Sequence, residues 1–219
     1  MKTYEVRPAA RPPALDGDGD GPGWTAAEPL ALEAFMGERP AHFPRVQARV
    51  LYDARALYVA FRVEDRYVRA VAEHLHGEVW KDSCVEFFFT PGVDPAPGYF
   101  NLEVNCGGTF IMRHQQSLEE FRLIDPADCA GVEVYHSMPK IVNPELAGPL
   151  TWGVAYRLPL DFLSKYAPVT PPAPGVTWRA NFYKCADDSS HPHWLTWSPI
   201  DWPEPRFHLP EFFGVLKFS

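Results

Sequence analysis

The sequence is poor in positive charge and contains no run of lysine or arginine. Its 20 Lys and Arg residues are outnumbered by 28 Asp and Glu residues, which gives a formal net charge of -8. A surface that binds nucleic-acid phosphates needs clustered cations, so we expect no nucleic-acid partner. Long apolar runs are lacking as well, since no stretch approaches the roughly 20 residues that cross a bilayer. We therefore expect no membrane-spanning segment.

The first residues, MKTYEVRP, lack the apolar stretch of a secretory signal. For the chain as written this predicts a cytoplasmic location, whereas removal of a leader would allow an extracellular one. The sequence alone leaves the location undecided between these two.

Cysteine is scarce and scattered. The four residues are Cys84, Cys106, Cys129 and Cys185, and no two of them form a Cys-x-x-Cys pair. That spacing argues against a zinc site or a redox motif. Isolated cysteines in apolar strands are most often reduced packing residues. We expect this role for all four, with one disulfide as the alternative.

Proline and aromatic residues, by contrast, are plentiful. The chain has 24 prolines, and 14% of its residues are aromatic. Proline interrupts long helices, and aromatic side chains favour pleated, half-buried strands. Helical patterning is weak and is confined to short segments at 117–123 and 160–166. The composition therefore argues against an α-helical bundle.

Many short segments alternate between apolar and polar residues, as strands do. Residues 46–52 and 57–63 alternate around a turn at 53–55, and 99–105 and 109–114 flank a second turn, so both pairs predict hairpins. The alternation predicts eight residues buried between two sheets: Val59, Phe61, Val85, Phe87, Leu102, Val104, Trp178 and Phe182. About ten short strands with one or two short helices predict an all-β fold. We expect a single antiparallel β-sandwich, jelly-roll or Greek-key-like, formed by one domain over residues 1–219.

Polar side chains occupy the other face of three predicted strands. At alternate positions lie Asn101, Glu103 and Asn105 in one strand, Arg179, Asn181 and Tyr183 in a second, and Glu86 in a third. Amides, carboxylates and a guanidinium supply hydrogen-bond donors and acceptors suited to a polyhydroxylated ligand. The alternative is an ordinary solvated face of an antiparallel sheet.

Tryptophan is the second feature that points to a sugar. The apolar C–H face of a sugar ring stacks on an indole, while its hydroxyls need polar partners at the ring edge. Trp80 and Trp202 lie beside charged residues or proline, so we expect them to be exposed and to contact a ligand. Trp152 and Trp178 lie inside strand patterns and are predicted core residues.

An acidic turn near the N-terminus is a candidate metal site. The run Asp16-Gly17-Asp18-Gly19-Asp20-Gly21 places carboxylates at alternate positions before a glycine, as calcium loops do. A full calcium loop would require glutamate at position 27, where this sequence has Ala27. The candidate ligands of a structural Ca²⁺ are therefore Asp16, Asp18 and Asp20, and a flexible acidic turn is the alternative.

Several blocks of the sequence, taken in chain order, match one family. They are Leu15-Asp16-Gly17 with Trp24, residues 50–53 with 57–59, residues 80–88, residues 100–105, Trp178 with Asn181, and Trp197-Ser198 through Phe213-Gly214. Together they resemble carbohydrate-binding module family 9, within the wider group of DOMON-like β-sandwiches. The resemblance covers nearly the whole chain. It implies a non-catalytic module that binds the end of a sugar chain between two tryptophans.

The resemblance also implies roles for single residues. Trp80 matches the first stacking tryptophan, and Glu86, six residues later, matches the hydrogen-bonding carboxylate. Asn105 matches a sugar-binding asparagine, and Trp202 is the candidate for the second tryptophan. Glu103 stands where the family pattern has an arginine, and we expect Arg179 on a neighbouring strand to supply the missing cation. No cofactor is expected apart from calcium, which is structural in some members.

Two other functions stay open at this point. A DOMON-like haem domain would use Met112 or His114, which share one strand face, as axial ligand. A glycoside hydrolase would use Glu86 and Glu103 as its pair of carboxyl groups.

Overall fold

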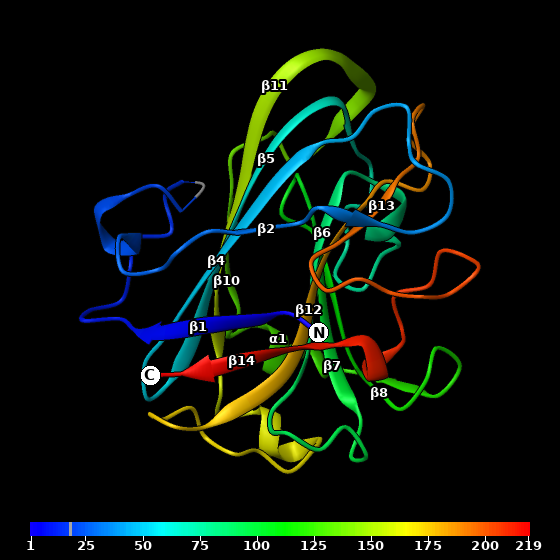
Figure 1. Cartoon of the computed structure of the whole chain (residues 1–219). Helices are drawn as coiled ribbons and strands as arrows, with labels where there is room; N and C mark the ends of the chain where they lie inside the picture. Colours follow the sequence, from blue (N-terminus) through cyan, green and yellow to red (C-terminus); the bar gives the residue numbers. More distant parts are fainter. Residues whose placement is uncertain (18) are drawn as a thin grey trace.

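The computed structural model describes residues 1–17 and 19–219, and within these residues it has fourteen strands and one short α-helix. The strands form one curled sheet whose two halves lie opposite each other around a hydrophobic core (Figure 1).

The first half contains β10 (Glu133–His136), β11 (Val142–Pro159), β5 (Ala56–Ala70) and β4 (Arg45–Tyr52), with β2 (Leu30–Ala31) beside β4. The second half contains β14 (Gly214–Phe218), β12 (Thr177–Cys185), β6 (Cys84–Thr90), β7 (Tyr99–Asn105), β8 (Phe110–Gln115) and β9 (Phe121–Leu123). β13 (Trp194–Thr196) extends it beside β12 and pairs with β3 (Ala34–Phe35).

β1 (Thr3–Pro8) joins the two halves and corrects the predicted topology. Its first part pairs with β14 and its last two residues pair with β4, and both pairings are parallel. The expectation of an exclusively antiparallel sandwich was therefore wrong. Alternation within one strand shows which side chains share a face, but it does not show the direction of a partner that is distant in the chain.

Four strands of the structure, β1, β2, β3 and β9, were not among the ten expected. β2, β3 and β9 have two or three residues each, too few for alternation to be visible in the sequence, whereas β1 has six residues and was missed. β9 lies in the segment 117–123, where we expected a helix; it pairs with β8 as an edge strand. The α-helix is α1 (Pro126–Cys129), and four 3₁₀ turns complete the regular structure of the described residues: η1 (Pro22–Trp24), η2 (Val79–Lys81), η3 (Leu163–Lys165) and η4 (Pro210–Phe212).

The core between the two halves confirms the predicted alternation. All eight residues expected there are fully buried, and they belong to one hydrophobic cluster with strands of both halves. Aromatic rings dominate it: Phe87 stacks on Phe89 and on Phe182, with ring centroids 4.8 Å apart in both pairs. Trp152 and Trp178 lie in this core, as predicted. Burial of these large rings is a main source of the fold's stability.

The hairpin between β7 and β8 needs glycine at its turn. Gly108 has a φ of +81°, and a Cβ atom there would lie 2.3 Å from the His136 ring. The Asn105 side-chain oxygen accepts hydrogen bonds from the backbone N–H groups of Gly107 and Thr109, at 3.1 and 2.9 Å. The turn therefore fixes the register in which Asn101 pairs with Arg113.

All four cysteines lie among the described residues, where each is buried and free. The four cysteines are therefore reduced packing residues, as expected, and the alternative of one disulfide is wrong. Among residues 1–17 and 19–219, no helix has the length and apolar character that a bilayer crossing requires.

Candidate functional site

The outward face of β6, β7, β8 and β12 carries the predicted polar rows, and it is not a solvated sheet face. A second hydrophobic cluster, which includes Met36, Val79, Phe207 and Phe213, lies over it. As a result the polar side chains on this face are buried: Glu86, Asn101, Glu103, Asn105 and Asn181 are each at most 2% exposed. Buried polar groups require partners, so each must be satisfied by protein or by a ligand.

A pocket of about 340 Å³ opens where this cover is incomplete. Its walls contain two indole rings, three carboxyl groups and two guanidinium groups, a combination of flat apolar and charged surfaces. The lining residues are Trp80, Glu86, Glu103, Arg113, Leu118, Phe121, Cys185, Asp187, Trp194, Pro205, Arg206, Phe207 and His208. Three predicted site residues, Trp80, Glu86 and Glu103, meet in this pocket.

Trp80 lies in η2, just before β6, and the buried Asp82 carboxylate holds this segment in place. Asp82 Oδ2 accepts hydrogen bonds from the backbone N–H groups of Val71 and Ala72, both at 3.0 Å, and from Asn105 Nδ2 at 2.9 Å. The Arg113 guanidinium lies over the Trp80 indole, 5.2 Å from the ring centroid. Trp80 thus forms one wall of the pocket, and its side chain is half-buried.

Trp194, not Trp202, is the second tryptophan of the pocket. Trp194 begins β13, and its indole nitrogen donates a hydrogen bond to Asp187 Oδ1 at 2.9 Å. Trp202 is 44% exposed and is not among the lining residues. The sequence alone could not show which of Trp194 and Trp202 lines the pocket, because this depends on the pairing of β13 with β12.

Glu86 and Glu103 lie directly opposite each other on β6 and β7. Burial raises the pKa of Glu86 well above its ordinary value, and the neighbouring Cys185 and Glu103 raise it further. The pKa of Glu103 is raised to about 7 by burial, although Arg113 and the Asn101 amide act in the opposite direction. Burial therefore favours the protonated form of Glu86, which can donate a hydrogen bond as well as accept one.

Arg113 is one of the two arginines of the pocket, with Arg206, and sequence reasoning missed it. Its guanidinium donates to Glu103 Oε1 at 3.3 Å and lies over the rings of Trp80 and Phe121, 5.2 and 5.1 Å from their centroids. Arg179, which was expected to supply this charge, instead donates to the backbone carbonyls of Phe213 and Gly214. The register of the β7–β8 hairpin was the signal that could have identified Arg113, since it pairs with Asn101.

The remaining polar residues of the predicted site hold loops in place. Asn181 donates to the Ser198 carbonyl at 2.9 Å and accepts from the Ser198 N–H at 2.8 Å, which ties the covering segment to β12. Asn101 donates to Glu103. Asn105 closes the β7–β8 turn and contacts Asp82. Asn105, Arg179 and Asn181 are not among the residues that line the pocket.

One of the proposed calcium ligands, Asp20, is paired with arginine. Asp18 lies outside the described residues. The Asp20 carboxylate accepts a hydrogen bond from Arg49 at 2.7 Å and lies 3.5 Å from the Arg62 guanidinium. A carboxylate between two guanidinium groups is already neutralised, so its environment does not favour a cation.

The candidate haem ligands also lie away from the pocket. Met112 is buried in the core cluster, and the ring of His114 packs edge-on against Phe100 with centroids 5.0 Å apart. Neither residue is among those that line the pocket.

A family model described as "Carbohydrate-binding family 9" matches residues 27–218 of this chain. The chain belongs to carbohydrate-binding family 9. The family consists of non-catalytic binding modules, so the prediction that the chain is not an enzyme is confirmed and the hydrolase alternative is set aside. A search of curated proteins found no match.

Solved structures of similar proteins agree with this family assignment. The chain is 29% identical, with a TM-score of 0.88, to a "putative carbohydrate-binding protein" from Bacteroides uniformis, over 100% of this chain and 99% of that one. It also matches a family 9 module from Caldicellulosiruptor kristjanssonii in complex with cellotriose, at 16% identity and a TM-score of 0.68, over 100% of this chain and 94% of the module. The same organism's module in complex with glucose matches at 17% identity, also with a TM-score of 0.68, over 100% and 96% of the two chains. At these lower identities the likeness concerns the fold alone.

Substitution of Asn105 with alanine is expected to lower the stability of this family 9 protein more than its ligand binding. The change removes two acceptor contacts in the β7–β8 turn and the donor contact to Asp82. Loss of buried hydrogen bonds costs on the order of 2 kcal/mol. Urea unfolding measures this loss. A variant of wild-type stability with lost sugar affinity would instead make Asn105 a ligand contact.

Glu103 is expected to make stability fall as the pH rises. Its pKa is 4.5 in an unfolded chain and about 7 in the folded protein, so between these values the folded state retains a proton that the unfolded state loses. The free energy of unfolding therefore decreases with pH across this window. His193 and His208, whose pKa values burial lowers from 6.5 to about 3, act with the opposite sign between these values, a range that overlaps the Glu103 window. The measurement is the difference in unfolding free energy between wild type and Glu103→Gln over pH, and a difference that is independent of pH would contradict this expectation.

Proposed function

We propose that the pocket binds the terminal ring of an oligosaccharide, with the ring stacked between Trp80 and Trp194. The observation that carries this proposal is the meeting of two indoles with carboxyl and guanidinium groups in one pocket. β6, β7 and β8 supply Glu86, Glu103 and Arg113, and η2 and β13 supply the indoles as walls. Flat apolar walls over a polar floor match the two kinds of surface that a sugar ring presents.

The size of the pocket supports a small ligand. Pockets for small molecules occupy roughly 300–1,000 Å³, and this one, at about 340 Å³, lies at the lower end of that range. It therefore suits one sugar ring with part of a second, and not the middle of a long chain. Recognition of a chain end follows from this size.

The polar floor can satisfy hydroxyl groups in both of their roles. Arg113 is a donor only, the Asp187 carboxylate accepts, and the protonated form of Glu86, which burial favours, both donates and accepts. A sugar hydroxyl donates one hydrogen bond and accepts others, so it needs both kinds of partner.

Glucose and cello-oligosaccharides are the first ligands to test, because the family 9 module from C. kristjanssonii is in complex with cellotriose in one structure and with glucose in the other. Calorimetric titration of this chain with glucose, cellobiose, cellotriose and xylose is expected to show saturable binding of at least one of them. Competition between glucose and cellotriose for the same pocket is expected if both bind. Absence of binding by every mono- and oligosaccharide in a broad glycan array would overturn the proposal.

We propose further that residues 1–219 act as one domain without a metal cofactor for sugar binding. The main core cluster includes side chains from β1 and from β14, so the first and last strands pack into the same core. Addition of calcium chloride to chelator-treated protein is expected to leave sugar affinity and the melting temperature unchanged, because Asp20 is already paired with arginine. A rise in melting temperature with calcium, lost in Asp16→Asn, would restore the acidic turn as a calcium site.

A further inference from the structure

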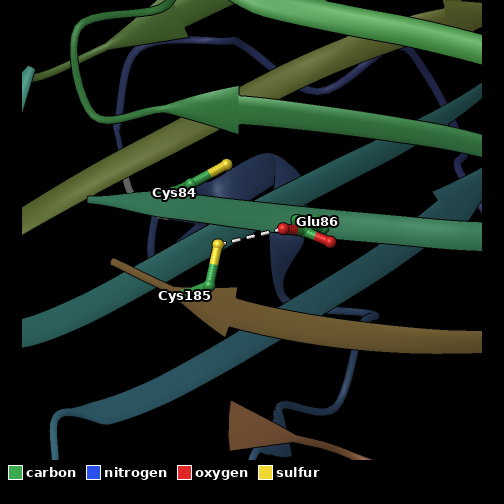
Figure 2. A group of neighbouring side chains, drawn as sticks. All are labelled: Cys84, Glu86 and Cys185. Carbon is green, nitrogen blue, oxygen red and sulfur yellow. Dashed lines mark hydrogen bonds between the residues drawn. The ribbon is translucent and has the colours of Figure 1, made fainter. Parts of the chain in front are cut away.

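Strand pairing brings together two cysteines that are about a hundred residues apart in the sequence. Cys84 begins β6, Cys185 ends β12, and the two residues lie directly opposite each other in the antiparallel pair. Glu86, two residues after Cys84, shares their face of the sheet (Figure 2). One ligand atom from each residue lies within 4.8 Å of the other two. The Cys185 thiol donates a hydrogen bond to Glu86 Oε1 at 3.0 Å, the dashed line in Figure 2.

We propose that Cys84, Glu86 and Cys185 form a Zn²⁺ site at the floor of the pocket. Two sulfur atoms and one carboxylate oxygen are a ligand set that zinc accepts in tetrahedral coordination, whereas calcium and magnesium require oxygen ligands. The spacing of cysteines in the sequence argued against zinc, because no two are close along the chain. The pairing of β6 with β12 supplies the proximity instead.

The position of the cluster gives an ion both a route and an open coordination site. Glu86 and Cys185 line the pocket, and Cys84 lies behind them, fully buried. An ion that enters the pocket therefore reaches the cluster from its Glu86 and Cys185 side. With three protein ligands, the fourth tetrahedral position would be left for a water molecule from the pocket.

Zinc must displace protons from all three groups. Burial raises the pKa of Cys84 to about 12 and raises the pKa of Cys185 and of Glu86 well above their ordinary values. Both thiols are therefore protonated at neutral pH and burial favours the protonated form of Glu86, so binding of one Zn²⁺ would release the two thiol protons and any proton that Glu86 carries to solvent. The affinity for zinc consequently rises with pH.

Cobalt titration tests the site without reference to sugar binding. Reduced, chelator-treated protein with four free thiols is titrated with Co²⁺, which occupies zinc sites and reports its ligands in the absorption spectrum. We expect a single equivalent to produce a thiolate-to-cobalt charge-transfer band and the intense visible bands of tetrahedral Co²⁺, all removed by Zn²⁺. A spectrum without a thiolate band overturns the proposal, whatever the protein does with sugars.

Matched cysteine variants assign the band to the cluster. Cys84→Ser and Cys185→Ser are each expected to weaken Co²⁺ binding at least tenfold and to reduce the charge-transfer band. Cys106→Ser and Cys129→Ser, which change equally buried thiols outside the cluster, are expected to keep both. Glu86→Gln should weaken binding while the thiolate band persists. Circular dichroism confirms that each variant is folded. Retention of the full band in both Cys84→Ser and Cys185→Ser would overturn the assignment.

Discussion

Substitution of Trp178 with alanine is expected to lower the free energy of unfolding by about 3–5 kcal/mol. The Trp178 indole is fully buried, stacks on Phe89 with centroids 5.6 Å apart and meets the Phe218 ring edge-on at 5.2 Å. Its nitrogen donates to the Thr170 carbonyl at 2.9 Å. The variant loses these contacts and leaves a large cavity, because the surrounding β12, β6 and β14 backbones are fixed by their ladders.

Urea unfolding followed by circular dichroism measures this loss. Trp202→Ala is the matched control, since Trp202 is 44% exposed and its removal is expected to change stability by less than about 0.5 kcal/mol. A Trp178→Ala protein within about 1 kcal/mol of wild type would mean that the ring is not packed between the two halves of the sheet.

Substitution of Trp80 with alanine is expected to weaken sugar binding by about 2–3 kcal/mol, which corresponds to roughly 30–150-fold in dissociation constant. Trp80 is a half-buried wall of the pocket, so its loss removes stacking surface for a ligand without opening a cavity in the main core. The melting temperature should change little. Calorimetry with the tightest-binding sugar measures the effect.

Two further tryptophan variants make this result specific. Trp194→Ala is expected to weaken binding to a similar degree, because Trp194 lines the same pocket. Trp202→Ala should bind as wild type does. If Trp202→Ala lost affinity while Trp80→Ala and Trp194→Ala retained it, the sugar would lie outside the pocket, on the exposed segment that carries Trp202.

Alternation in the sequence predicted the faces of the strands correctly, and with them part of the site. Phe87 and Leu102 lie in the core and Glu86 and Glu103 on the opposite face because successive side chains of a strand point to opposite sides. Trp80 followed from its place just before the Glu86 strand. These predictions required only local periodicity.

The residues that the sequence could not place depend on long-range packing. Asn105, Arg179 and Asn181 share the face of Glu86, yet Asn105 bonds to its own hairpin turn, and Arg179 and Asn181 bond to backbone carbonyls of later segments. Conversely, Arg113 reaches the pocket through a hairpin register, and Trp194 through a three-residue strand. Periodicity shows which face a side chain takes, but it does not show which segment covers that face.

The two cysteines of the cluster illustrate the same limit more strongly. Separation along the chain made Cys84 and Cys185 look like unrelated packing residues, and only the pairing of β12 with β6 reveals them as neighbours. Because alternate residues of a strand share a face, Cys84 and Cys185 both lie on the face that carries Glu86. Neither fact can be read from one segment alone.

The most direct test of sugar binding in the pocket is one nuclear magnetic resonance titration that observes the indole N–H groups of all seven tryptophans. The resonances are assigned with single Trp→Phe variants, and the sugar identified by calorimetry is the titrant. We predict that the signals of Trp80 and Trp194 shift together and saturate, while those of the buried Trp178 and the exposed Trp202 stay in place. A titration in which Trp202 shifts and Trp80 and Trp194 do not would contradict the proposed site.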